Sequence, residues 1–152
     1  GPTGKVIGFD VQKQAVENTA QKLLLAGLTD QVTLLHQGHE TLADVLADNA
    51  KIGGAIFNLG YLPGSDKTII TKKNTTISAI EALLPKLRIG SYILLVVYSG
   101  HPGGMEEKKA LLDYCSSLNQ SLFKVLQYGF INQINHPPFL IAIEKKKTPY
   151  TK

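Results

Sequence analysis

Tryptophan is absent from this sequence of 152 residues, and cysteine occurs once, at Cys115. A single cysteine excludes an internal disulfide, which is typical of proteins from a reducing compartment. Because Cys115 lies in the amphipathic segment ALLDYCSSL, we interpret its thiol as part of the core rather than as a nucleophile. No uninterrupted apolar run reaches the roughly 18 residues that a membrane-spanning helix needs. These features favour a cytoplasmic protein that does not span a membrane.

The excess of positive charge is small, with a formal net charge of +4. It is weak evidence for an anionic partner such as nucleic acid. Part of it lies in the final segment EKKKTPYTK, where we interpret Lys145 to Lys147 as a solvated end. The spacings H-x-x-x-H and C-x-x-C do not occur in the sequence, so we expect no metal site.

Short apolar segments alternate with amphipathic segments along most of the chain. They predict strands at 5–10, 31–37, 53–59 and 91–99, and helices at 11–27, 40–49, 74–87 and 105–118. The last two apolar segments, 121–130 and 137–145, have no helix between them, so we expect antiparallel neighbours. The alternation predicts a single α/β domain over residues 1–152, with helices on both faces of a mostly parallel sheet and a terminal antiparallel strand pair.

Polar residues follow each of the first four predicted strands. Ligands bind beyond the carboxyl ends of strands in such a sheet, so these residues are the candidates for a site. They are Asp10, then Gln37, Gly38 and His39, then Asn58 to Tyr61, and then Tyr98 to His101. A carboxylate in the place of Asp10 suits a ribose diol, because it accepts both hydroxyl protons. The alternative for Asp10 is a cap on the helix that follows.

The segment NLGYLPG after the third predicted strand is the most informative one. The carbonyl oxygen of Asn58 and a neighbouring backbone carbonyl can accept hydrogen bonds from an amino group and so align its lone pair. Tyr61 offers a face on which a base can stack. An ordinary turn is the alternative, because asparagine, glycine and proline are common in turns.

Three histidines are candidates for ligands, bases or structural roles: His39, His101 and His136. His101 lies among glycines in SGHPGG, and we favour it for substrate contact or proton transfer. His136 precedes Pro137 and Pro138, where a rigid turn could direct it over the site.

Five segments, GFDVQKQAVENT, HQGHETL, IFNLGYLPGSDK, YSGHPGG and NQINHPPFL, together resemble the YtqB-like family, also called MnmM and long labelled as rRNA methylases. The resemblance covers nearly the whole chain. It implies a Rossmann-like class I methyltransferase that uses S-adenosylmethionine. Members of this family methylate the aminomethyl nitrogen of 5-aminomethyluridine derivatives at the tRNA wobble position. The implied partners are therefore the anticodon loop of tRNA and, as in other members, a second copy of the chain in a homodimer.

The resemblance also implies roles for individual residues. Asn58 and the Leu59 carbonyl would hold the substrate amine, with Gly60, Tyr61 and His136 beside the substrate. The cofactor would contact Asp10 through its ribose and Gly38 and His39 near its adenine, with Val11, Gln12, Asn58 and Leu59 nearby. Relatives often have an acid where this chain has Gln37, and an amide there could still bond the adenine amino group.

The family's first strand and its glycine-rich loop would precede the segment GKVIGFD, so we expect the natural chain to contain further sequence before residue 1. Three other functions stay open at this point. The same asparagine loop would serve an rRNA base N-methyltransferase. A nicotinamide-dependent dehydrogenase has a related sheet, and a non-catalytic cofactor-binding module would retain the fold without turnover.

Overall fold

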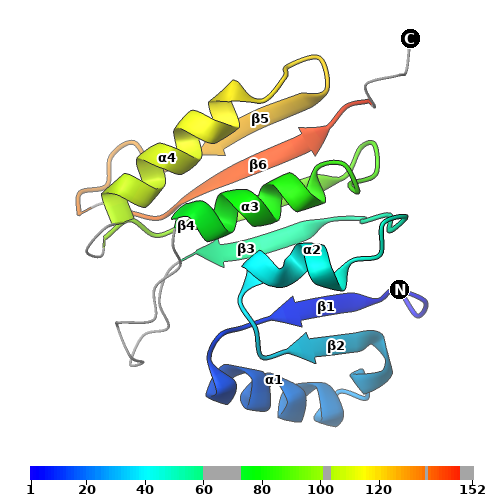
Figure 1. The fold of residues 1–152 in the computed structure, drawn as a ribbon. Coiled ribbons are helices and arrows are strands. Elements are labelled where there is room, and N and C mark those ends of the chain that lie inside the picture. The colour runs from blue at the N-terminus through cyan, green and yellow to red at the C-terminus, as the bar shows by residue number, and fades with distance from the viewer. Residues whose placement is uncertain (60–72, 101–103, 136, 148–152) are drawn as a thin grey trace.

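The computed structural model describes residues 1–59, 73–100, 104–135 and 137–147. Strands and helices alternate until the last two strands, which follow one another directly (Figure 1). The strands are β1 (Val6–Phe9), β2 (Val32–Leu35), β3 (Ala55–Leu59), β4 (Tyr92–Val97), β5 (Phe123–Tyr128) and β6 (Phe139–Lys145). The α-helices are α1 (Lys13–Leu25), α2 (Leu42–Val45), α3 (Lys73–Leu83) and α4 (Gly104–Ser117), and two short 3₁₀ helices are η1 (Thr29–Gln31) and η2 (His39–Thr41).

The strands form two hydrogen-bonded groups. β1 pairs with β2 in parallel, and the other four strands follow the order β3-β4-β6-β5. β3 is parallel to β4, while β6 is antiparallel to both β4 and β5. The predicted α/β fold, mostly parallel with a terminal antiparallel pair, is therefore confirmed. The structure adds that β6 is inserted between β4 and β5.

β1 and β3 each have only one strand neighbour among the described residues. Their other edges lie on the sides of the two groups that face each other in Figure 1. An unpaired edge leaves backbone N–H and C=O groups available to a further strand. The further strand expected from the family resemblance would fit between β1 and β3, and it stays a prediction.

One face of the four-stranded group forms the core. α3 and α4 cover this face (Figure 1), where Ile93 of β4 pairs with Ile143 of β6. Both side chains are fully buried, as is Cys115 of α4, which confirms its prediction as a core thiol. On the opposite face Ile56 of β3 is 76% exposed. The described helices therefore bury only one of the two apolar faces of this group.

The helix predicted over 40–49 is shorter than expected. It consists of η2 and the single turn α2, and it ends because Leu46 adopts an extended conformation with ψ 122°. The polar turn formers Asp48 and Asn49 follow and lead into β3. No helix in the described part of the chain is long and apolar enough to cross a membrane.

The interpretation of Lys145 as part of a solvated end is wrong. Lys145 is the last residue of β6 and is only 4% exposed. Its ammonium group donates hydrogen bonds to the carbonyl oxygens of Leu84 and Pro85, at 2.9 and 3.0 Å, directly after α3. A cation at this end of a helix satisfies carbonyls that lack intrahelical partners and interacts favourably with the helix dipole.

We therefore expect Lys145→Met to lower the free energy of unfolding by about 1–3 kcal/mol, because hydrogen bonds from a charged donor would be lost at a buried site. Lys147→Met is the matched control, since Lys147 is exposed and the change in charge is the same. Urea denaturation of both variants measures the difference. Equal stabilities would show that the contacts of Lys145 do not stabilise the fold.

Candidate functional site at the carboxyl ends of the strands

The carboxyl ends of β1, β2, β3 and β4 lie on one side of the molecule, because β1 and β2 are parallel to each other and β3 is parallel to β4 (Figure 1). We call this side the carboxyl edge. The described residues that follow the strands there are Asp10, His36 to His39, and Tyr98 to Gly100, and Asn58 and Leu59 end β3. Those predicted positions that lie within the described residues are thus on one edge.

Asp10 is fixed by two hydrogen bonds. Its N–H donates to Leu35 O (3.1 Å), and its Oδ1 accepts from the N–H of Gln12 (2.8 Å). Gln12, rather than Asp10, is the N-cap of α1. Asp10 is exposed, and its Oδ2 makes no hydrogen bond within the described residues. One carboxylate oxygen therefore orders the turn, and the other is available to a ligand.

His36 links the first two strand ends and was not among the predicted site residues. Its Nε2 lies 3.0 Å from Val11 O, so this nitrogen carries the proton and donates, because a carbonyl can only accept. The bond holds the turn after β1 against the end of β2. The position of His36 directly after an apolar strand was the available signal.

Gly38 is buried, and the carboxylate of Glu40 packs directly against its Cα. A Cβ at residue 38 would overlap that carboxylate, so a larger residue would force Glu40 to move. The expected acid is replaced by Gln37 in this chain, and the Oε1 of Gln37 lies 3.0 Å from the hydroxyl of Thr41. Glu40, which the sequence did not single out, therefore supplies a carboxylate beside Gly38.

The ring of His39 points into the protein. It packs edge-on against Phe57 of β3, with ring centroids 5.5 Å apart, and its Nε2 lies 3.4 Å from Oγ1 of the buried Thr76 of α3. Burial lowers the pKa of His39, and the nearby Glu40 partly offsets this effect. The ring is thus a neutral spacer between β3 and α3, and the backbone of His39 is the part that lies at the carboxyl edge.

Asn58 and Leu59 have opposite environments at the end of β3. Asn58 is exposed and lies opposite Val96 of β4, whereas the Leu59 side chain is buried. The carbonyl of Leu59 accepts a hydrogen bond from Tyr98 N–H at 3.2 Å. A carbonyl oxygen has two lone pairs, so this bond still leaves one acceptor position.

Two buried polar groups follow β4: Ser99, which belongs to the predicted segment Tyr98 to His101, and Glu107, which was not predicted. The Oγ of Ser99 has no hydrogen-bond partner in the described part of the chain. Glu107, in the first turn of α4, is 6% exposed, and burial raises the pKa of its carboxyl to about 7. The predicted residues Gly60, Tyr61, His101 and His136 lie outside the described residues. Among described residues, no group of three or more histidine, cysteine or acidic side chains could hold a metal ion.

A family model described as "Putative rRNA methylase" matches residues 6–144. The chain belongs to this rRNA methylase family. The crystal structure of a "putative rRNA-methylase" from Clostridium thermocellum is 40% identical in sequence, with a TM-score of 0.90, over 95% of this chain and 77% of that one. A methyltransferase from Streptococcus mutans, solved in complex with SAH, is 42% identical with a TM-score of 0.85, over 93% and 76%.

A curated relative from Arabidopsis thaliana is named "tRNA (mnm(5)s(2)U34)-methyltransferase, chloroplastic". It is 36% identical over an alignment of 149 residues that covers 96% of this chain and 54% of the relative. The chain therefore spans about half the length of this curated relative. These similarities confirm the family and the Rossmann-like methyltransferase fold predicted from the sequence.

The buried carboxyl of Glu107 predicts a pH dependence of stability. Burial raises its pKa from an ordinary value of 4.5 to about 7, so the folded state binds more protons than the unfolded state between these values. The contribution of the neutral Glu107 carboxyl to the free energy of unfolding is fully present below about pH 4.5 and is lost as the pH rises through 7. From pH 5 to pH 8, the unfolding free energy of Glu107→Gln should rise relative to wild type by roughly 1–3 kcal/mol.

The exposed neighbour Glu106 provides the control, and Glu106→Gln should follow the wild-type pH profile. Urea titrations at several pH values give these free energies. Parallel profiles for wild type and Glu107→Gln would mean that the carboxyl is not held in its neutral form by burial.

Proposed function

We propose that the protein is an S-adenosylmethionine-dependent tRNA methyltransferase. Its substrate would be the aminomethyl nitrogen of 5-aminomethyl(-2-thio)uridine at the wobble position. The main support for this proposal is that Asp10 and Asn58 both lie at the carboxyl edge, at the ends of β1 and β3, the two strands with an unpaired side. The Arabidopsis relative, a tRNA methyltransferase by name, supports the substrate.

The described residues fit an adenosyl cofactor at the carboxyl edge. Asp10 offers an exposed carboxylate oxygen for the ribose hydroxyls, held in place through Gln12 and the linked Val11. Gly38 and the backbone of His39 would lie beside the adenine, with the Glu40 carboxylate next to them. When bound, S-adenosylmethionine supplies a methyl group activated by its positively charged sulfur.

The chain's own contribution would be to orient the substrate amine. The side-chain oxygen of Asn58 accepts one hydrogen bond from it, and the second lone pair of the Leu59 carbonyl accepts another. These two acceptors fix the direction of the nitrogen lone pair, and such positioning is worth about 7–11 kcal/mol in favourable cases. Gly60, Tyr61 and His136 are proposed to border the substrate, with Tyr61 as the stacking face for the base.

The amine must also lose a proton, because an alkylamine is mostly protonated at neutral pH. Removal from water favours its neutral form. His101 is proposed as the proton acceptor, since it is the histidine nearest in sequence to the end of β4. A wobble base lies in a single-stranded loop, so turning it into the site requires little unpairing. The homodimer and the cytoplasmic location stay predictions.

Methylation of rRNA is the second candidate, and the family description favours it. An assay with two RNA substrates distinguishes these candidate functions. The complete natural protein is incubated with labelled S-adenosylmethionine and either rRNA or tRNA that carries 5-aminomethyluridine. We expect label in tRNA alone. Label in rRNA alone would overturn the tRNA assignment, and cofactor binding without transfer to either RNA would indicate a non-catalytic module.

In the same assay, Asn58→Ala should lower kcat about 100-fold, because the amine would lose the acceptor that aligns it. Asn49→Ala is the matched control, since Asn49 is exposed and precedes β3 at its opposite end. Retained kcat in Asn58→Ala would exclude the proposed role of the amide.

Asp10→Asn should weaken cofactor binding about 10- to 100-fold in calorimetry, because a charged acceptor for the ribose would be lost. Asp30→Asn is the matched control, since it makes the same change in charge in η1, before β2. It should bind the cofactor as tightly as wild type. An unchanged affinity in Asp10→Asn would place the ribose elsewhere.

A further inference from the structure

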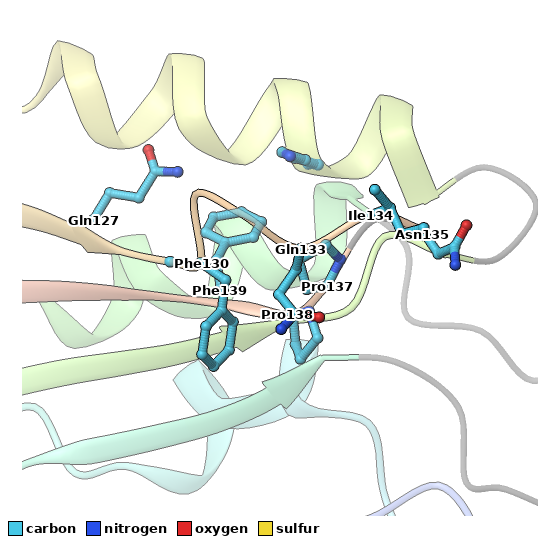
Figure 2. Close-up of a pocket in the computed structure, with 10 residues that line it drawn as sticks. Gln127, Phe130, Gln133, Ile134, Asn135, Pro137, Pro138 and Phe139 are labelled. Carbon is cyan, nitrogen blue, oxygen red and sulfur yellow. The ribbon is translucent and has the colours of Figure 1, made fainter.

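A cavity lies at the carboxyl edge, on the side of β4 away from β3. It has a volume of about 420 Å³ and lies between α4 and the connection from β5 to β6 (Figure 2). We call it the α4 pocket. The lining residues that matter here are Lys108, Gln127, Phe130, Gln133, Asn135 and Phe139. A cavity of this size is in the range of small-ligand sites and has room for a nucleobase with its ribose.

The strand register places the α4 pocket beside the proposed methylation site. Phe139 begins β6 opposite Val97 of β4, and Val97 in turn lies opposite Leu59 of β3. Leu59 and Phe139 are therefore two strand spacings apart, about 10 Å. A single-stranded RNA whose target nucleotide reached Asn58 could place a neighbouring nucleotide in this pocket.

The lining combines an aromatic ring, primary amides and a lysine, three kinds of group that bind unpaired nucleotides. Phe130 is 61% exposed and presents an aromatic face beside the pocket (Figure 2). Gln127, Gln133 and Asn135 carry primary amides, each of which both donates and accepts, as the edge of a base requires. The ammonium of Lys108 lies 4.9 Å from the centre of the Phe139 ring. None of the described lining residues carries a carboxylate that would repel a phosphate.

The backbone of the connection supports a ligand at this place. Asn135 has φ 65° and is the only described residue other than glycine with positive φ. Such conformations cost energy and occur often in segments that hold ligands. Two apolar side chains of the same connection are also exposed, Ile131 almost completely and Ile134 at 82%. Exposed apolar groups beside polar ones are typical of an interaction surface.

We propose that the α4 pocket binds one unpaired nucleobase of the substrate RNA, next in sequence to the methylated nucleotide. The base stacks on Phe130, an amide of Gln133 or Asn135 pairs with its edge, and Lys108 neutralises the adjoining phosphate. This assignment rests on the proposed function and adds a position at which the enzyme distinguishes RNA sequences. The amides and the lysine favour RNA over a second copy of this chain as the occupant.

The test uses the complete natural protein and a fluorescent anticodon stem-loop that carries 5-aminomethyluridine. Loss of a stacked base costs about 5- to 150-fold in affinity, so Phe130→Ala should weaken binding by that factor while calorimetry shows unchanged cofactor affinity. Lys108→Ala should also weaken binding, and more so at low salt. Ile89→Ala and Lys22→Ala, on the turn before β4 and on α1, are the matched controls.

Stem-loops with a single abasic position identify the base. Removing the base at one position beside the wobble nucleotide should weaken the binding of the stem-loop to wild-type protein. The same removal should not weaken its binding to the Phe130→Ala variant any further, because the two changes remove the same contact. Equal RNA affinity of wild type and Phe130→Ala would overturn the pocket assignment alone. A shift from dimer to monomer in Phe130→Ala with unchanged RNA affinity would also overturn it, in favour of a second copy. Wild-type protein that does not bind the stem-loop would overturn the proposed function as well.

Discussion

The parallel register between β3 and β4 is the constraint on which the candidate site depends. This register places Asn58 opposite Val96, and the last hydrogen bond between the two segments joins Tyr98 N–H to Leu59 O. Because β6 is antiparallel to β4, its first residue, Phe139, also lies at the carboxyl edge, next to Val97. A slip of one residue would turn Asn58 into the core and expose both Phe57 and Leu59, so the burial of these two apolar side chains fixes the position of the amide.

The two groups of strands give the carboxyl edge its form. Asp10 belongs to one group and Asn58 to the other, and the strands that carry them have unpaired edges on the sides that face each other. A ligand that contacts both residues would therefore cross from one group to the other. The α4 pocket lies farther along the same edge, beyond β4. The proposed cofactor, target nucleotide and neighbouring nucleotide thus follow one another along the edge in the order of the strands.

The order of strands and helices was predictable from the sequence because apolar spacing is a local property. The same holds for the burial of Cys115 and for the polar residues after each strand. The burial of Lys145 could not be predicted in this way, because a run of three lysines is usually exposed to solvent. Its hydrogen-bond acceptors, the carbonyls of Leu84 and Pro85 after α3, are about 60 residues away in the sequence. The burial of Glu107 and the inward ring of His39 depend in the same way on packing that the local sequence does not show. Positions 60, 61, 101 and 136 lie outside the described residues, so their roles still rest on the sequence.

A crystal structure of the complete natural protein with S-adenosylhomocysteine bound would show most directly whether Asp10 and Asn58 contact the same ligand. The carboxylate of Asp10 should accept hydrogen bonds from both ribose hydroxyls, at roughly 2.7–3.2 Å. The side-chain oxygen of Asn58 should lie on the sulfur side of the same molecule, with space for an amine between them. A ligand bound away from either residue, or an Asn58 side chain directed away from the sulfur, would show that these two strand ends do not form one methyl-transfer site.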